Sequence, residues 1–105
     1  MAESTGGAVD FAHLERYMAG DRAVMGEILA IFRQQALTWG PGLADDAPNW
    51  RETVHTIKGA GRGIGAFVLG DVCERAEREG PGALPRVREA LAAAVAEIEA
   101  FLAQP

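Results

Sequence analysis

The chain has little of several residue types that often carry chemistry. Among its 105 residues there is one cysteine, Cys73, one lysine, Lys58, and one serine, Ser4. A single cysteine cannot form a disulfide within the chain, and Cys73 falls on an apolar helical stripe, where a small buried hydrophobic role is usual. Because Ser4 lies in a short polar start, the sequence places no serine nucleophile in a fold.

Long hydrophobic runs and excess positive charge are also lacking. No stretch approaches the roughly 18 uninterrupted apolar residues of a membrane-spanning helix, and residues 1–7 have no basic start leading into an apolar run. Ten basic residues face fifteen acidic ones, for a net charge of −5. This balance argues against a general nucleic-acid or anionic-membrane surface. We therefore expect a cytoplasmic protein that binds neither.

Cofactor sites are not predicted either. The two histidines and the cysteine lie on separate expected elements, whereas a metal site needs several ligands together. The sequence has no glycine-rich loop that ends in Gly-Lys-Ser or Gly-Lys-Thr before a helix, and it is too short for an additional nucleotide-binding domain. We expect the chain to have no cofactor of its own and no autokinase activity.

The apolar residues, 49% of the chain, repeat at helical spacing, and no alternating strand pattern competes. A short helix capped by Asp10 is expected to turn Phe11, Leu14, Tyr17 and Met18 toward the core. Four longer helices are expected over about 21–38, from the Asp45–Pro48 segment to about 63, over about 66–79, and from about 84 onward. The sequence thus predicts an all-α fold, an antiparallel four-helix bundle with a short additional N-terminal helix. This single domain spans residues 9–103, and residues 1–8 are expected to be disordered.

The second of these long helices carries the most informative pattern. An apolar stripe follows helical spacing and runs through a glycine: Trp50, Val54, Ile57, Gly61 and Ile64. His55 lies on the other side of the helix, on a face that it shares with Arg51, Lys58, Gly59 and Arg62. We expect His55 to face solvent, with Lys58 one turn along to bring positive charge beside it. An interior glycine costs a helix about 1 kcal/mol, so Gly59 is expected to give another molecule access to the ring.

A carboxylate on the next helix can reach the same ring. If the chain reverses near residues 63–66, His55 and Glu77 both lie about 15–18 Å from the turn and therefore side by side. A carboxylate there could accept a hydrogen bond from one imidazole nitrogen, fix the tautomer, and leave the other nitrogen free as a nucleophile.

Read together, these residues resemble the histidine-containing phosphotransfer (HPt) family, whose signature is His-x-Leu-Lys-Gly-small-small-x-x-Leu-Gly-Ala-x-x-Leu, followed by Cys and then Leu-Glu or Leu-Gln. The matching positions fall in register without a gap: His55, Ile57, Lys58, Gly59, Ala60, Gly61, Ile64, Gly65, Ala66, Leu69, Cys73 and Glu77. Ala76 departs from the usual larger aliphatic residue, and Gly63 adds flexibility, but neither touches a proposed chemical group.

The resemblance implies a phosphocarrier in a multistep two-component phosphorelay. His55 would take a phosphoryl group from an aspartate of one response-regulator receiver domain and pass it to another, with Lys58 offsetting the phosphoryl charge. Any Mg²⁺ would belong to the receiver partner. Docking of this expected monomer would be transient and would use the face around Gly59, with Arg51, Glu52 and Arg62 as partner-binding residues.

Two other classes of function remain open at this point. In a helical interaction module without chemistry, His55 would be incidental, Lys58 an ordinary solvated residue, and Glu77 a surface acid paired with Arg75 or Arg78. The second alternative is the dimerisation and histidine segment of a sensor kinase, which is expected to have an acidic residue directly after the histidine. Here Thr56 follows.

Overall fold

The computed structural model describes residues 7–104, and within this range every regular element is a helix. The predicted disorder of residues 1–6 lies outside the described residues. The elements are α1 (Phe11–Tyr17), α2 (Arg22–Trp39), the 3-10 helix η1 (Gly40–Leu43), α3 (Trp50–Gly63), α4 (Phe67–Glu79), the 3-10 helix η2 (Pro81–Ala83) and α5 (Leu84–Leu102).

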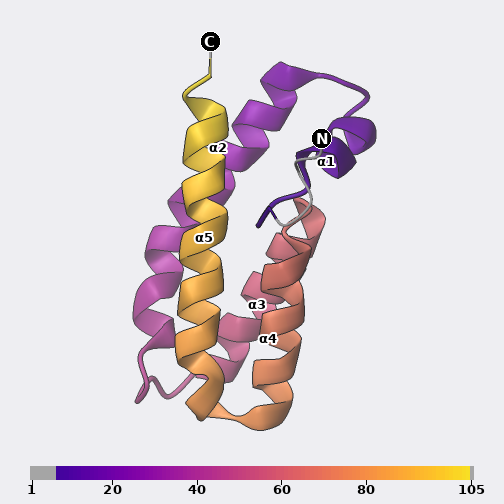
Figure 1. Cartoon of the computed structure of the whole chain (residues 1–105). Coiled ribbons are helices and arrows are strands. Elements are labelled where there is room, and N and C mark those ends of the chain that lie inside the picture. The colour runs from indigo at the N-terminus through magenta and orange to yellow at the C-terminus, as the bar shows by residue number, and fades with distance from the viewer. Residues whose placement is uncertain (1–6, 105) are drawn as a thin grey trace.

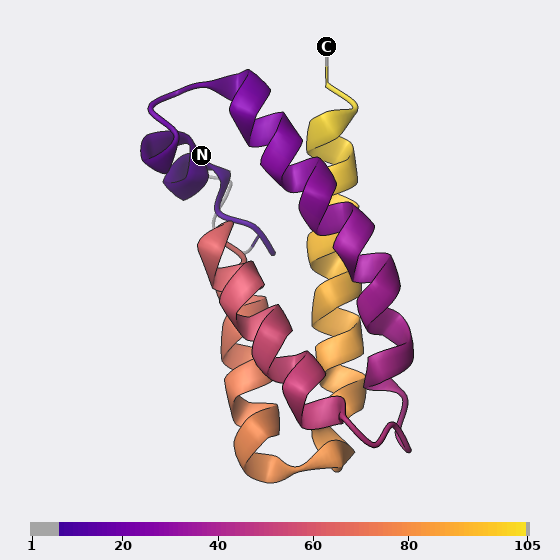
Figure 2. The ribbon, with the colours of Figure 1, turned by 180° about the vertical axis from the view of Figure 1, so that it is seen from behind.

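The four long helices run alternately up and down and pack side by side as a bundle (Figure 1). α3 packs most closely on α4, and α5 packs on both α4 and α2. α2 and α5 are each longer than α3 or α4, which together form a hairpin. α1 lies at the end of the bundle where the turn between α3 and α4 is (Figures 1 and 2). The predicted all-α bundle with an additional short N-terminal helix is confirmed.

The core follows from the helical stripes of the sequence. Each of the five α-helices contributes side chains that are no more than 1% exposed, for example Leu14, Leu29, Ile57, Leu69 and Ile98. Burial of such side chains is the main favourable term in the stability of the bundle. The expected core position of Tyr17 is wrong, because this ring is 75% exposed at the last residue of the short helix α1.

Side-chain capping explains two of the five α-helix starts. The side chains of Asp10 and Asp21 accept hydrogen bonds from the backbone N–H groups of His13 and Val24, at 3.0 and 3.1 Å. The predicted start of α3 at the Asp45–Pro48 segment is wrong, since the helix begins at Trp50. Asp45 instead forms an ion pair with Arg88 of α5, 3.1 Å away, so its carboxylate is turned away from a capping position.

Hydrogen bonds from backbone N–H groups hold α1 and the residues before it in place. Asp10 N–H donates to the Gly65 carbonyl (2.9 Å) in the turn between α3 and α4. The Glu97 carboxylate of α5 accepts from the N–H groups of Ala8 and Val9, at 2.6 and 2.9 Å. Contrary to the predicted disorder of residues 1–8, Ala8 is therefore anchored, because α5 offers a carboxylate for its N–H.

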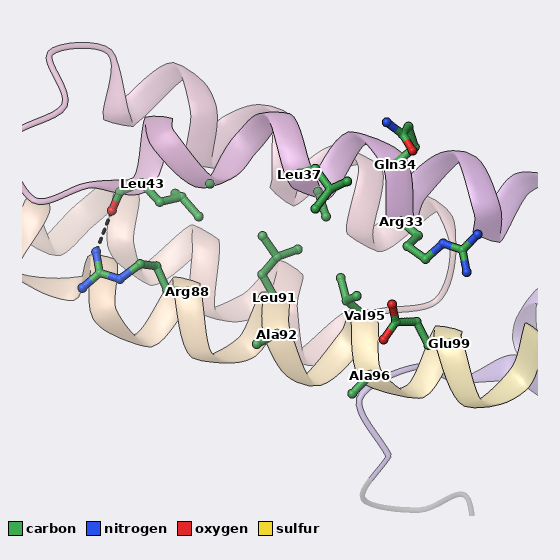
Figure 3. A pocket seen from close by; sticks show the side chains of 12 residues that line it. Arg33, Gln34, Leu37, Leu43, Arg88, Leu91, Ala92, Val95, Ala96 and Glu99 are labelled. Atoms are coloured by element: carbon green, nitrogen blue, oxygen red, sulfur yellow. Dashed lines mark hydrogen bonds between the residues drawn. The ribbon is translucent and has the colours of Figure 1, made fainter.

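A groove of about 570 Å³ lies between α2 and α5, lined by apolar side chains that include Leu37, Leu91 and Val95 (Figure 3). At one end of it, Arg88 donates to the Leu43 carbonyl at 2.6 Å and so ties η1 to α5. No helix within residues 7–104 is long and apolar enough to cross a membrane.

Candidate functional site

His55 projects from the middle of α3 into solvent. Its side chain is 71% exposed, whereas Val54 and Ile57 on the opposite side of the helix are fully buried. The stripe that packs α3 into the bundle therefore leaves the imidazole outside, as the sequence indicates.

Glu77 of α4 joins the ring to Lys58. Its Oε2 lies 2.8 Å from His55 Nδ1, and its Oε1 lies 2.6 Å from Lys58 Nζ. Lys58 and Glu77 are 21% and 19% exposed, so their ion pair is largely sheltered between the two helices. The structure thus brings together the three side chains that the sequence predicts to meet, and it adds a Lys58–Glu77 ion pair that the sequence did not predict.

The charge on Glu77 fixes the state of the ring. The Lys58 ammonium, and to a smaller extent the His55 ring, hold the pKa of the Glu77 carboxyl below its usual value, so Glu77 is ionised near neutral pH. An ionised carboxylate only accepts hydrogen bonds, so Nδ1 of His55 carries the proton. In the neutral ring the lone pair then lies on Nε2, away from Glu77 and available to a reactant.

The glycines of α3 differ in what surrounds them. A Cβ built on Gly59 would meet nothing within 4 Å, so nothing inside the described bundle requires a glycine there. A Cβ on Gly61 would come 3.2 Å from Leu69 Cδ2, so this glycine lets α4 approach closely. Gly61 is thus a helix-contact position, and the expected role of Gly59 in access stays a prediction.

Arg51 covers one side of Glu77. Its guanidinium donates to the Glu77 main-chain carbonyl and lies 4.6 Å from the ring centroid of Trp50. A shallow hollow of about 510 Å³ lies beside the imidazole, and it is lined by Arg51, Glu52, His55, Thr56 and Glu77. Arg51 and Glu52 were predicted on this surface from the sequence, but the bond from Arg51 across to α4 was not.

Arg62 is committed to a different network. Its guanidinium lies 2.6 Å from a Glu74 carboxylate oxygen and 3.2 Å from one of Asp71, and its aliphatic part covers Gly70. These carboxylates, Glu74 first, raise the pKa of the Arg62 guanidinium. Arg62 therefore connects α3 to α4, and its part in partner binding stays a prediction.

Two comparisons with known proteins agree with this geometry. The model of the Hpt domain family matches residues 22–103, which include the whole site. The chain belongs to the Hpt family.

The fold agrees with a solved member of similar function. The chain is 55% identical in sequence to the histidine phosphotransferase ShpA from Caulobacter crescentus. The crystal structure of that protein superposes with a TM-score of 0.83, and the match covers 90% of each chain. Among curated proteins, none matches the chain. Hpt proteins are phosphocarriers of two-component relays that work with receiver domains and kinases. The expected family and phosphorelay role are confirmed.

In this Hpt protein the cysteine of the signature is a core residue. Cys73 is fully buried under the site, and burial raises the pKa of its thiol to about 12. The thiol is therefore neutral and unreactive near neutral pH, as its place on the apolar stripe indicates. No group of three or more potential metal-ligating side chains occurs within residues 7–104.

Proposed function

We propose that His55 is the phosphoryl carrier of this Hpt protein and that Nε2 is the reacting atom. The observation that supports this most is the Glu77 hydrogen bond to Nδ1, which leaves the Nε2 lone pair on the exposed side of the ring. Nε2 attacks the phosphorus of an aspartyl phosphate, the acyl P–O bond breaks, and the aspartate leaves as a carboxylate.

Lys58 and Gly59 serve this step from the next turn of α3. The Lys58 ammonium balances the charge of the phosphoryl oxygens in the transition state, and the bare backbone at Gly59 lets the receiver domain approach the ring. Arg51 and Glu52 face the partner beside His55.

The partners are receiver domains of response regulators or of a hybrid kinase. Mg²⁺ is bound by the receiver, and this monomeric chain supplies the imidazole without a cofactor or autokinase activity of its own. Docking is transient, because a donor and an acceptor must use the same histidine in turn.

The direct test is phosphoryl transfer from a labelled receiver domain to the purified protein and to its His55→Gln variant. We expect an acid-labile label on the wild type and none on the variant, with His13→Gln as a control that keeps the label. A label that persists in His55→Gln would contradict the assignment. A helical module without chemistry would take no label, and a sensor-kinase segment would show the mass of a dimer in light scattering.

Lys58→Ala tests the electrostatic role. We expect transfer to slow about tenfold, which corresponds to about 1.4 kcal/mol in the barrier, because one cation near the phosphoryl oxygens is lost. Rapid-quench measurement of the labelled protein gives the rate, and circular dichroism checks that the bundle is intact. An unchanged rate would remove Lys58 from the mechanism.

A further inference from the structure

The Glu77 carboxylate serves two donors at once in the unphosphorylated protein. One oxygen bonds the Lys58 ammonium at 2.6 Å, and the other bonds the His55 ring at 2.8 Å. The Glu77 carboxylate therefore interacts with one cation, the Lys58 ammonium, and with one neutral group, the His55 ring protonated at Nδ1 alone.

Phosphorylation changes the charge on both sides of this arrangement. When Nε2 bonds to phosphorus and Nδ1 keeps its proton, the ring becomes a cation that carries a dianionic phosphoryl group. The Lys58 ammonium then has two anions within reach of its flexible side chain, Glu77 and the phosphoryl oxygens. The phosphoryl group carries more negative charge than the carboxylate and has three strong acceptor oxygens, so it attracts the Lys58 ammonium more strongly than Glu77 does.

We propose that Lys58 exchanges partners when His55 is phosphorylated, moving from Glu77 to the phosphoryl group and leaving the whole carboxylate to the Nδ1–H of the phosphorylated ring. This inference rests on the proposed function of His55. In this exchange Glu77 acts as a positioning residue with two states. Before phosphorylation it binds both Lys58 and the neutral His55 ring, and after phosphorylation it releases Lys58 to the phosphoryl group and binds the cationic ring alone.

The exchange protects the form of the ring that can give up its phosphoryl group. In delivery, an aspartate oxygen attacks phosphorus, the N–P bond breaks, and its electron pair returns to Nε2. A ring that keeps the Nδ1 proton leaves as neutral imidazole, whereas one that has lost it would leave as an anion. The charged groups that surround the ring are Arg51, Glu52 and Lys58 of α3 and Glu77 of α4, of which Glu77 alone contacts Nδ1.

The chain offers a direct probe, because Lys58 is its one lysine. In protein labelled with ¹⁵N-lysine, NMR detects one side-chain ammonium signal. Phosphoramidate, a small donor that phosphorylates imidazole, loads the full chain without a partner protein. We expect the Lys58 Nζ signal to shift on loading in the wild type and to have no such shift in His55→Gln. A signal that does not move when His55 is loaded overturns the exchange.

A pH titration tests the second half of the proposal. In a His13→Gln background, the ³¹P signal follows the phosphorylated ring and the ring proton signals follow the unloaded one. We expect Glu77→Gln to make the loaded ring lose its proton at lower pH, because that ring then lacks the carboxylate that faces its Nδ1–H, and to change the unloaded ring less, because Lys58 shares the carboxylate there. Equal shifts in both states, or none, contradict the inference.

Glu74→Gln is the matched control. It removes one carboxylate one turn earlier on α4, where Glu74 pairs with Arg62, and it should leave both titrations unchanged. The proposed function fails separately: it fails if phosphoramidate and receiver domains both leave His55 unlabelled. A labelled His55 with an unmoved Lys58 signal removes the exchange alone.

Discussion

At the scale of single residues, Gly59 shows stability given up beside the reacting ring. A methyl group there would meet nothing within 4 Å in the described structure, and the position is inside a regular helix. Gly59→Ala should therefore raise the free energy of unfolding by about 1 kcal/mol, since alanine loses less backbone entropy on folding. Urea denaturation followed by circular dichroism measures this change.

The same substitution should slow transfer from a receiver domain. The added methyl group lies one turn from His55, where it displaces the incoming aspartyl phosphate, and we expect a loss of about tenfold or more. Gly63→Ala is the matched control, because Gly63 also has open surroundings on α3 but lies a further turn away. If Gly59→Ala transfers at the wild-type rate, access is not the reason for this glycine.

The residue pairings in the site were only partly predictable from the sequence. Counting residues from the turn placed His55 beside Glu77, because both positions depend on the regular rise of two antiparallel helices. The ion pair of Lys58 with Glu77 did not follow from this count. The path of a long flexible side chain depends on which acceptors the neighbouring helix presents.

At the scale of elements, the turn between α3 and α4 depends on Gly65. Its φ of +91° lies in the region that favours glycine, and a Cβ there would come 2.7 Å from the Asp10 carbonyl oxygen. Gly65→Ala should lower the free energy of unfolding by about 2 kcal/mol or more, through backbone strain and the displaced contact with α1.

Urea denaturation tests this against Gly59→Ala, which adds the same methyl group with the opposite expected sign. Loss of the 2.9 Å bond from Asp10 N–H to Gly65 O should also free the start of the chain, and hydrogen exchange at Asp10 reports it. A Gly65→Ala variant as stable as the wild type would show that the turn tolerates side chains.

Helix existence was predictable because apolar stripes and aspartate caps are local signals. The start of α3 was not, since Asp45 pairs with Arg88 from a distant part of the chain. Nor was the anchoring of Ala8 by Glu97, because nothing near either residue indicates the other. The predicted core position of Tyr17 was wrong because a helix of two turns offers little buried face for its last residue.

At the scale of the whole molecule, the site lies on one pair of helices, and the other pair completes the core behind it. His55 and Lys58 are on α3 and Glu77 is on α4, whereas α2 and α5 complete the core behind them. The family signature covers this hairpin, so the sequence identified the site more completely than the loops and tethers that complete the bundle.

Cys73 reports on the integrity of this arrangement because it is fully buried where the hairpin meets the core and is the one cysteine of the chain. A thiol-alkylating reagent reaches it only when the structure opens. For a domain with about 5 kcal/mol of stability or more, native alkylation should be at least about 10³-fold slower than in urea. Mass spectrometry over time at pH 8 measures both rates, and destabilisation by Gly65→Ala should speed the native reaction. Fast native labelling would instead mean that α4 separates locally from the core under His55, so that Glu77 could not hold the ring.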